Sequence, residues 1–203
     1  MAAFDVILFD VGGVLLTNGW DRREREAAVE QFKLNAEDLE TRHAEVMPAW
    51  ERGEIDLKHY LDAAVFYESR RFSREQFFSF MLAQSQLLPG GAMGILRELA
   101  ASHRFMIGAL NNEARETNDF RFAKFDLRRH LKVALSSCYV GLRKPEPAIY
   151  HRALDILGSP PARVLFIDDR EENVAGGAAA GMTAIQFTGE SALCKELNEL
   201  GVL

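Results

Sequence analysis

Acidic, basic and amide side chains follow the short apolar runs of this chain, at the points where those runs would end as strands. In chain order the groups are Asp10-Val11-Gly12-Gly13, Asn111-Asn112, Arg143-Lys144-Pro145 and Asp168-Asp169. Parallel strands of an open α/β sheet present their carboxyl ends to one crevice, which is where ligands bind. The sequence therefore predicts that three carboxylates, one lysine and two amides meet around one site.

Three carboxylates in one crevice repel one another, and in a dry site they need a cation to stay ionised. Ligation by the oxygens of Asp10, Asp168 and Asp169 favours Mg²⁺ over zinc, and Mg²⁺ held by few protein groups takes waters and phosphate oxygens as its remaining ligands. Lys144 adds a compact positive charge suited to phosphate or to clamping a carboxylate. Asp10, in a turn loosened by glycines, is then a candidate nucleophile that forms an aspartyl-phosphate.

Each of these groups also has a purely structural explanation. A single Asp at a strand end is commonly a helix cap, and Asp168-Asp169 could cap a helix that begins near Glu171. It is the order of the four groups along one chain that favours a catalytic site.

The elements that must position these groups alternate between strands and helices. Five short apolar runs are predicted strands: Phe4–Phe9, Phe105–Leu110, Val133–Leu135, Val164–Ile167 and Thr183–Phe187. Their near-continuous apolarity is typical of strands buried on both faces of a parallel sheet. A helix predicted at Ala148–Leu157 carries one apolar face and ends at Gly158. The pattern favours an α/β fold with a doubly wound, Rossmann-like parallel sheet.

One long stretch breaks this alternation. Over residues 17–88 the apolar residues recur at helical spacing, and Ser73 and Gln76 have the spacing of a capping box. We therefore expect a small helical insertion there, between the first and second strands, and a core formed by residues 1–16 and 89–203. The alternative is that these helices pack along the sheet as part of one body.

Composition excludes several classes of protein. A hydrophobic fraction of 48% with 27% charged residues is that of a globular chain of 203 residues, not a disordered one. Subtracting 30 acidic from 24 basic residues gives a net charge of −6, which argues against binding to nucleic acid or to an anionic membrane, but not to a phosphorylated small molecule. No apolar run approaches the roughly 20 residues of a membrane span.

The expected location follows from the cysteines and the amino terminus. Cys138 and Cys194 are too few for a disulfide framework, which indicates a reducing compartment, and we expect the cytoplasm. The first apolar stretch is interrupted by Asp5 and Asp10 and has no basic region before it, so we do not expect a signal peptide.

The four groups resemble the ordered motifs of the haloacid dehalogenase superfamily. The matching segments are Phe9–Leu15, Asn111-Asn112, Gly141–Tyr150 and Phe166–Asn173. The resemblance covers the whole chain, because the predicted insertion matches the helical cap that one branch of the family carries between its first two motifs. It implies a Rossmann-like core and a Mg²⁺-dependent phosphatase that acts on a small phosphorylated metabolite, such as a sugar phosphate, through an aspartyl-phosphate.

The resemblance also implies a set of metal ligands. Asp10 would be the nucleophile and would bind Mg²⁺ with its second oxygen, alongside the backbone carbonyl of Gly12. Asp169 would be a direct ligand, and Asp168 a ligand directly or through water.

The phosphate would be held by the two middle motifs. Lys144 would neutralise the phosphate and steady the nucleophile. Asn111 stands where the family usually has Ser or Thr, whose hydroxyl binds the transferring phosphoryl group, and an amide can donate the same hydrogen bond. The backbone N–H of Asn112 would serve beside it. The cap would close over the crevice, exclude water and choose the substrate.

Gly12 departs from the family pattern. Phosphatases of this family normally have a second Asp at this position, which protonates the leaving group and then deprotonates the attacking water. Loss of a general acid and base slows a reaction about 10²–10⁴-fold. Another group such as Asn18, Asp21 or Glu51 could act instead, the substrate could carry a good leaving group such as a sugar-1-phosphate or acyl phosphate, or the protein could bind without much turnover.

Two other functions compete with the phosphatase. A dehalogenase uses the same Asp on carbon and needs no metal, so Asp168-Asp169 weighs against it. A catalytically weak binding or regulatory module is favoured by Gly12 and by the aromatic-rich insertion, although helical spacing makes those aromatics a core. We expect the charge-rich stretch Asp21–Glu30 to be a solvated helix face.

Overall fold

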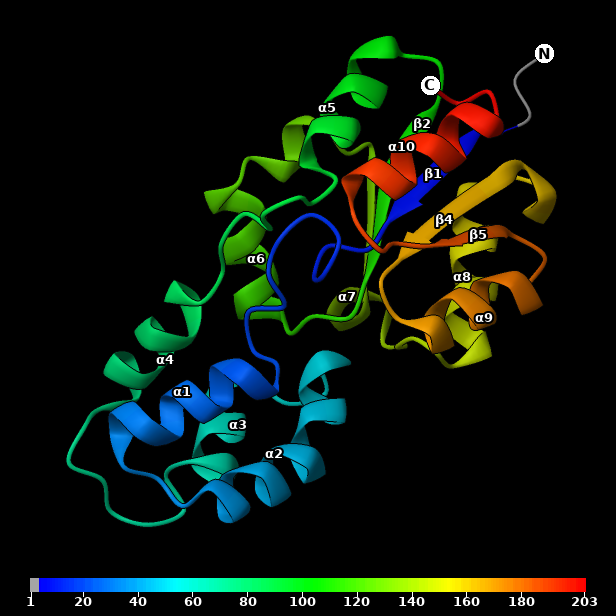
Figure 1. Cartoon of the computed structure of the whole chain (residues 1–203). Coiled ribbons are helices and arrows are strands. Elements are labelled where there is room, and N and C mark those ends of the chain that lie inside the picture. Colours follow the sequence, from blue (N-terminus) through cyan, green and yellow to red (C-terminus); the bar gives the residue numbers. More distant parts are fainter. Residues whose placement is uncertain (1–3) are drawn as a thin grey trace.

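A five-stranded parallel sheet with the strand order β3-β2-β1-β4-β5 forms the centre of the molecule (Figure 1). The computed structural model describes residues 4–203, so residues 1–3 of the predicted core segment 1–16 lie outside the described residues. The strands are β1 (Val6–Phe9), β2 (Met106–Asn111), β3 (Val133–Ser136), β4 (Val164–Asp168) and β5 (Thr183–Gln186). All five predicted strands and the α/β fold class are confirmed.

The central strands are buried on both faces, which explains their sequences. All residues of β1 and β4 are buried, and apart from Asp168 at the end of β4 their side chains are apolar without alternation. Ile7 of β1 packs into the hydrophobic core on one face of the sheet, while Leu8 packs into the core on the other. Gly108 of β2 allows tight packing there, because a Cβ at this position would lie 2.5 Å from Val133 Cγ1 and 2.9 Å from Leu8 Cδ2.

Helices cover both faces of the sheet. Those on the face of Ile7 are α5 (Met93–Ser102), α6 (Arg115–Lys124) and α10 (Glu190–Glu199). Those on the face of Leu8 are α8 (Pro147–Leu157) and α9 (Glu171–Ala179). Three short helical turns lie beside the strands. Leu127–Arg129 precedes β3, α7 (Ser137–Val140) follows β3, and Pro161–Arg163 precedes β4. Within residues 4–203, no helix has both the length and the apolarity that a membrane crossing requires.

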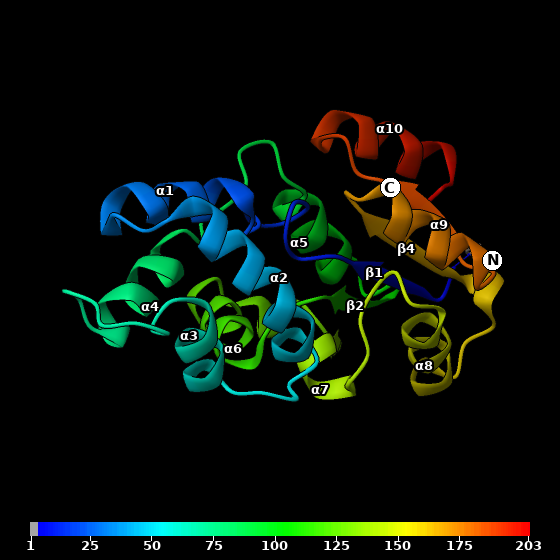
Figure 2. The same cartoon turned by 90° about the horizontal axis from the view of Figure 1, so that it is seen from below.

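Residues 17–88, all of which the structure describes, contribute no strand to the sheet. They contain α1 (Arg22–Phe32), α2 (Ala36–Glu51), α3 (Leu57–Ala64) and α4 (Arg74–Ala83). We call residues 17–88 the helical insertion and residues 4–16 and 89–203 the sheet core. The insertion lies beyond one end of the sheet in both views, and its buried apolar residues form a hydrophobic cluster that only Ala114 of the described sheet core joins (Figures 1 and 2). That it forms a separate cap domain stays a prediction.

The four insertion helices begin at residues that are suited to do so. Asp21, Asn35, Asp56 and Ser73 precede them, and each side chain accepts a hydrogen bond from a backbone N–H of the first turn. Ser73 and Gln76 form the predicted capping box. Helix starts in this segment are therefore encoded locally.

The chain enters and leaves the insertion at adjacent points. Thr17 N donates to Gln86 O, and the Thr17 hydroxyl donates to Gln84 O and accepts from Gln86 N. Helix α6 holds both connections: Arg121 donates to Thr17 O, and Lys124 Nζ donates to Ser85 O. The insertion is thus joined to the sheet core by a double connection, two adjacent chain segments that α6 holds through hydrogen bonds.

Candidate active site

Neighbouring strands bring the first and last predicted groups together. β1 and β4 pair in parallel with Phe9 opposite Ile167, so Asp10 follows β1 beside the end of β4, where Asp168 is the last residue. The ladder continues through Asp10 N, which donates to Ile167 O over 2.8 Å. The carboxyl ends of these strands therefore place both carboxylates on one edge of the sheet.

Lys144 lies between these two carboxylates. Its Nζ is 3.1 Å from Asp10 Oδ1 and 2.5 Å from Asp168 Oδ2, and only 1% of its side chain is exposed. Asp168 Oδ1 accepts hydrogen bonds from Arg170 N and from Asn173 Nδ2, each over 2.9 Å. Both oxygens of Asp168 are consequently held by the protein, and Asp168 in turn fixes the position of Lys144.

Asp169 completes what we call the strand-end cluster: Asp10, Lys144, Asp168 and Asp169. One carboxylate oxygen from each Asp lies within 4.8 Å of the others. Asp169 Oδ1 is buried and has no hydrogen-bond partner among the described residues. Orphaned buried oxygens are rare in folded proteins and suggest a missing partner. Hard oxygen donors in this arrangement fit Mg²⁺.

The pKa values of the cluster reflect crowded negative charge. Burial, together with the neighbouring Asp168, raises the pKa of Asp10 to about 7 despite the opposing effect of Lys144. Burial and Asp168 also raise the pKa of Asp169. Burial lowers the pKa of Lys144, but the carboxylates of Asp10 and Asp168 outweigh it and the net change is upward. The lysine therefore stays charged, but its single positive charge does not balance the three neighbouring carboxylates.

Gly13 permits the close approach of Asp169. Its φ of +72° is in the left-handed region, and a Cβ there would lie 2.2 Å from Asp169 Oδ2. Any side chain at residue 13 would therefore displace the carboxylate. The glycine brings the loop after β1 directly against the loop after β4.

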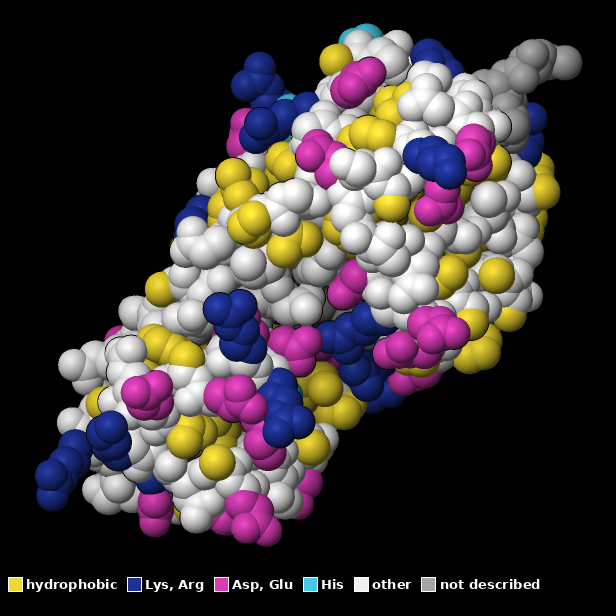
Figure 3. Space-filling model, viewed as in Figure 1, with side chains coloured by type: hydrophobic (Ala, Val, Ile, Leu, Met, Phe, Trp, Pro, Cys, Tyr) yellow, Lys and Arg dark blue, Asp and Glu magenta, His cyan; other side chains and the backbone are white. Residues whose placement is uncertain are grey.

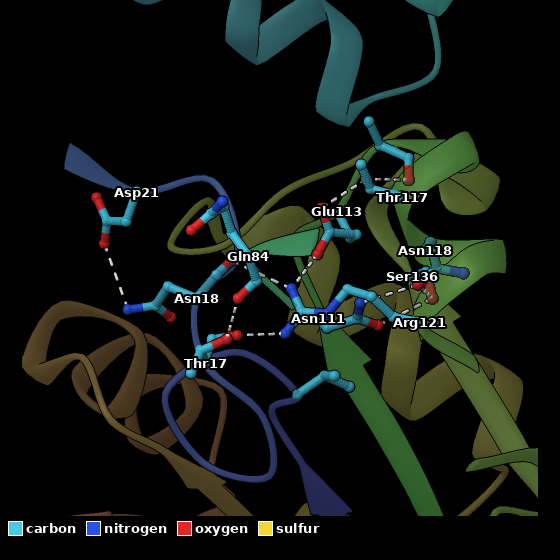
Figure 4. Close-up of polar contacts among 12 residues, drawn as sticks. Thr17, Asn18, Asp21, Gln84, Asn111, Glu113, Thr117, Asn118, Arg121 and Ser136 are labelled. Atoms are coloured by element: carbon cyan, nitrogen blue, oxygen red, sulfur yellow. Dashed lines mark hydrogen bonds and ion pairs between the residues drawn. The ribbon is translucent and has the colours of Figure 1, made fainter. Parts of the chain in front are cut away.

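In the second group, Asn111-Asn112, the side chain of Asn111 points away from the crevice in which we expected it to bind phosphate. The Asn111 amide donates to Asn118 Oδ1 over 3.0 Å and its Oδ1 accepts from the Ser136 hydroxyl (Figure 4). Asn111 is buried and does not line the cavity described below. Polar groups of α6 and β3 hold it beneath the crevice, and phosphate binding by this amide stays a prediction.

Asn112 does reach the site. Its amide donates to Lys144 O and its Oδ1 accepts from Lys144 N, each over 2.8 Å. This pair of bonds fixes the backbone that carries the lysine. Sequence reasoning assigned only the backbone N–H of Asn112 to the site, because the side-chain partner lies 32 residues away.

A cavity of about 370 Å³ opens between the strand-end cluster and the insertion. Its core side includes Asp10, Gly12, Asn112 and Lys144. The insertion side includes apolar and charged residues: Trp20, Asp21, Arg25, Glu40, His43, Ala44, Met47, Trp50 and Glu51. Figure 3 shows basic and acidic side chains gathering where the insertion meets the sheet core.

Ion pairs and hydrogen bonds hold the insertion against the core beside this cavity. Glu51 pairs with Arg143 at 2.8 Å, and the adjacent Arg52 pairs with Glu146. The hydroxyl of Ser137 donates to the backbone oxygen of Glu51 over 2.7 Å. These contacts link the end of α2 to the start of α7 and to the loop that carries Lys144.

A second polar group, the insertion cluster, consists of Trp20, Arg25, Glu40 and His43, which line the far wall of the cavity, and of Tyr60, which is buried behind them. Arg25 binds both oxygens of Glu40, at 2.7 and 2.8 Å. Trp20 Nε1 donates to the Tyr60 hydroxyl, which also shares a hydrogen bond of 2.8 Å with His43 Nδ1. Burial and nearby Arg25 lower the pKa of His43 to about 4, so this histidine is neutral.

The expectation of a solvated helix face at Asp21–Glu30 is wrong for Arg25. Its side chain is 8% exposed, because α1 packs against α2 and brings it to Glu40. Arg121 was also missed. Its side chain is 3% exposed and donates to Glu113 and to the backbone oxygens of Thr17 and Asn18 (Figure 4). No local sequence signal identifies such residues, since their partners come from other elements.

Comparison with known proteins agrees with the motifs. A family model described as haloacid dehalogenase-like hydrolase matches residues 4–181. The chain is 32% identical over 164 residues to flavin mononucleotide hydrolase 1 of Arabidopsis thaliana, which covers 81% of this chain but 65% of that protein. It is 27% identical over 202 residues to a sesquiterpene phosphatase of Aspergillus oryzae, with 97% of this chain and 96% of that protein covered.

Solved structures show the same fold. A magnesium complex of a HAD family enzyme from Bacteroides thetaiotaomicron has a TM-score of 0.78 and 19% identity, and covers 92% of this chain and 94% of that one. The family model spans most of the chain, and the fold agrees with it. The chain therefore belongs to the haloacid dehalogenase-like hydrolases and is a hydrolase of that family.

Proposed function

We propose that this enzyme is a Mg²⁺-dependent phosphatase that hydrolyses the monophosphate of a small molecule through an aspartyl-phosphate on Asp10. The strand-end cluster carries the proposal. Its three carboxylates and one ammonium leave a net charge of −2 when all are ionised, which a divalent cation balances. The unpartnered Asp169 Oδ1 gives such a cation a ready ligand.

The proposed metal ligands are Asp10, Asp169 and the backbone carbonyl of Gly12. Both oxygens of Asp168 already accept hydrogen bonds, which favours ligation by Asp168 through water. When bound, Mg²⁺ would neutralise charge on the phosphate and hold it in place.

The chain itself distinguishes the two oxygens of Asp10. Oδ1 accepts from Val11 N over 2.7 Å and lies 3.1 Å from Lys144 Nζ, whereas Oδ2 has no partner among the described residues. We assign attack on phosphorus to Oδ1, which is held in place, and the metal to Oδ2. Lys144 would then bind the incoming phosphate oxygen and steady the nucleophile in one position.

The names of two relatives support the substrate class. One is a flavin mononucleotide hydrolase and the other a sesquiterpene phosphatase. A cavity of about 370 Å³ has the size of a small-molecule site. A dehalogenase is disfavoured, because the paired carboxylates Asp168 and Asp169 would have no role in displacing halide from carbon.

The test measures phosphate release from a panel of phosphorylated small molecules, with Mg²⁺ and with chelator. Asp10→Asn should lower the rate by about 10⁴–10⁶-fold, as removal of a nucleophile does. The exposed Asp155 of α8 provides the matched control, and Asp155→Asn should act as wild type. The wild-type protein stopped in acid during turnover should carry one phosphoryl group. Phosphate release that is unchanged in Asp10→Asn or in chelator would overturn the proposal.

A further inference from the structure

The side-chain space at residue 12 is already filled. A Cβ on Gly12 would lie 2.9 Å from Asn18 Oδ1 and 3.8 Å from an Arg121 guanidinium nitrogen. Arg121 is itself locked by Glu113 and Thr17 O (Figure 4). An amide and a guanidinium exchange no proton at neutral pH, so a proton donor must come from elsewhere in the cavity.

Five carboxylates outside the strand-end cluster line this cavity: Asp21, Glu40, Glu51, Glu113 and Glu172. Three of them have both oxygens engaged. Asp21 starts α1 and accepts from Asn18 and Arg170, Glu40 is bound by Arg25, and Glu113 accepts from Arg121 and Thr117. Glu172 is exposed to solvent. Glu51 is therefore the carboxylate that remains.

Glu51 is held with one oxygen free. Its Oε2 accepts from Arg143 Nε at 2.9 Å and pairs with a second Arg143 nitrogen at 2.8 Å, while Oε1 has no partner among the described residues. Its side chain is 20% exposed, and its backbone oxygen is anchored by Ser137. A carboxyl group fixed in this way on the cavity wall keeps one oxygen available to a ligand.

We propose that Glu51 is the general acid and base that replaces the absent carboxylate at residue 12, an inference that rests on the proposed phosphatase function. As Asp10 Oδ1 bonds to phosphorus, the ester P–O bond breaks and the leaving oxygen takes the Glu51 proton, which gives a free alcohol. Glu51 then takes a proton from water as the water oxygen bonds to phosphorus. The bond from phosphorus to Asp10 breaks, inorganic phosphate leaves, and Glu51 is protonated again.

The surroundings of Glu51 suit both steps. Burial raises the pKa of its carboxyl group, Arg143 opposes that change, and Glu113 adds to it. Arg170 also faces this group and favours the charged form. A carboxyl group with a pKa moved towards neutrality can both donate and accept a proton at the working pH.

A purely structural role for Glu51 makes a different prediction. The Glu51–Arg143 pair also holds the insertion against the core, so its loss could slow any substrate by misplacing the insertion. A positioning defect would slow phosphorylation of Asp10 by every substrate alike. Loss of a proton donor would slow it only where the leaving oxygen is a poor leaving group.

The experiment is pre-steady-state hydrolysis by Glu51→Gln, with p-nitrophenyl phosphate and with the best alkyl monophosphate of the panel. With the aryl ester we expect a burst of p-nitrophenolate followed by slow turnover, because phosphorylation needs no acid but hydrolysis needs the base. With the alkyl ester we expect no burst and a rate about 10²–10⁴-fold below wild type. Glu45→Gln is the matched control and should act as wild type, because Glu45 is an exposed residue of the same helix that does not line the cavity.

Two outcomes would overturn the assignment. Glu51→Gln could hydrolyse the alkyl ester at the wild-type rate, or it could lose the aryl burst to the same extent as Arg143→Gln, which would make Glu51 a structural contact. If the wild-type enzyme shows no turnover, or turnover that does not depend on Asp10 and Mg²⁺, the proposed function is refuted, and the role of Glu51 with it. Thermal unfolding of each variant confirms that it is folded.

Discussion

Two polar clusters face each other across the cavity, and they are built in opposite ways. In the insertion cluster, Arg25 binds both oxygens of Glu40, and Trp20, Tyr60 and His43 form an unbroken chain of donors and acceptors. The strand-end cluster holds three carboxylates around a single lysine, and one buried oxygen has no partner.

The pKa values show the same contrast. The bond to Arg25 lowers the pKa of Glu40, as expected for a matched pair. Burial disfavours the charged form and, with the neighbouring Asp168, raises the pKa of Asp10 and of Asp169, although Lys144 opposes the change. A cluster that satisfies itself stabilises a wall, whereas a cluster with an electrostatic deficit is prepared for a ligand that supplies the missing charge.

The largest difference between the two clusters should appear in the free energy of unfolding when the basic residue of each is replaced. Lys144→Met leaves buried carboxylates unpaired and should lower the free energy of unfolding by about 3–5 kcal/mol in chelator. Arg25→Met should lower it by about 1–2 kcal/mol, because 43% of the Glu40 side chain is exposed and can be solvated. Urea unfolding with and without Mg²⁺ measures both.

Mg²⁺ should recover part of the loss in Lys144→Met and nothing in Arg25→Met. Equal losses in the two variants, or recovery of both by Mg²⁺, would remove the distinction between a matched and a deficient cluster.

Acid should weaken the insertion cluster through His43. The unfolded histidine takes up a proton below its usual pKa of 6.5, whereas the folded one does so only near 4. Between these values the unfolded state binds more protons, so stability falls as pH falls, by up to about 3 kcal/mol. His43→Asn keeps a hydrogen-bond acceptor for Tyr60 but does not titrate. The difference in unfolding free energy between wild type and His43→Asn should therefore shift in favour of the variant between pH 6.5 and 4.

The exposed His59 of α3 is the control for that titration. His59→Asn is measured beside His43→Asn by urea unfolding at several pH values. A His43→Asn variant with the same dependence as wild type would show that the pKa of His43 is not lowered by folding.

Added Mg²⁺ should stabilise the folded protein through the strand-end cluster and not through the insertion cluster. Binding to the folded state at 100 times Kd adds about 2.7 kcal/mol to the free energy of unfolding. Asp169→Asn should lose most of this gain, because it removes the charge beside the unpartnered oxygen. Thermal unfolding across a Mg²⁺ titration measures it, with Asp155→Asn as a control that keeps the full gain. The same gain in Asp169→Asn as in wild type would exclude Asp169 as a ligand.

The sheet and the place where its polar groups meet could be predicted from the sequence because both depend on local signals. Buried parallel strands are continuous apolar runs, and Asp10 and Asp168 follow two of them directly. Once the strands are parallel, their carboxyl ends must share an edge. The capping box at Ser73 is equally local.

What the sequence left open depends on partners that are distant along the chain. Asn111 turns towards Asn118 and Ser136, and Arg25 is buried only because α2 supplies Glu40. Arg121 reaches the backbone of Asn18, 103 residues away. Whether Asp21 or Glu51 keeps a free carboxylate oxygen could be read only from such contacts.

The double connection between the two parts has a consequence for how such an enzyme changes over time. Leu16 and Leu87 face each other as an antiparallel bridge, so the ends of the insertion are already closed where it leaves the core. To the sheet, the whole insertion is then a single loop, and the entropic cost of closing a loop grows only slowly with its length. An insertion of another size, with a different wall, could be exchanged at this point without moving Asp10. Substrate preference can therefore diverge among descendants of such a chain while the reacting groups stay where they are.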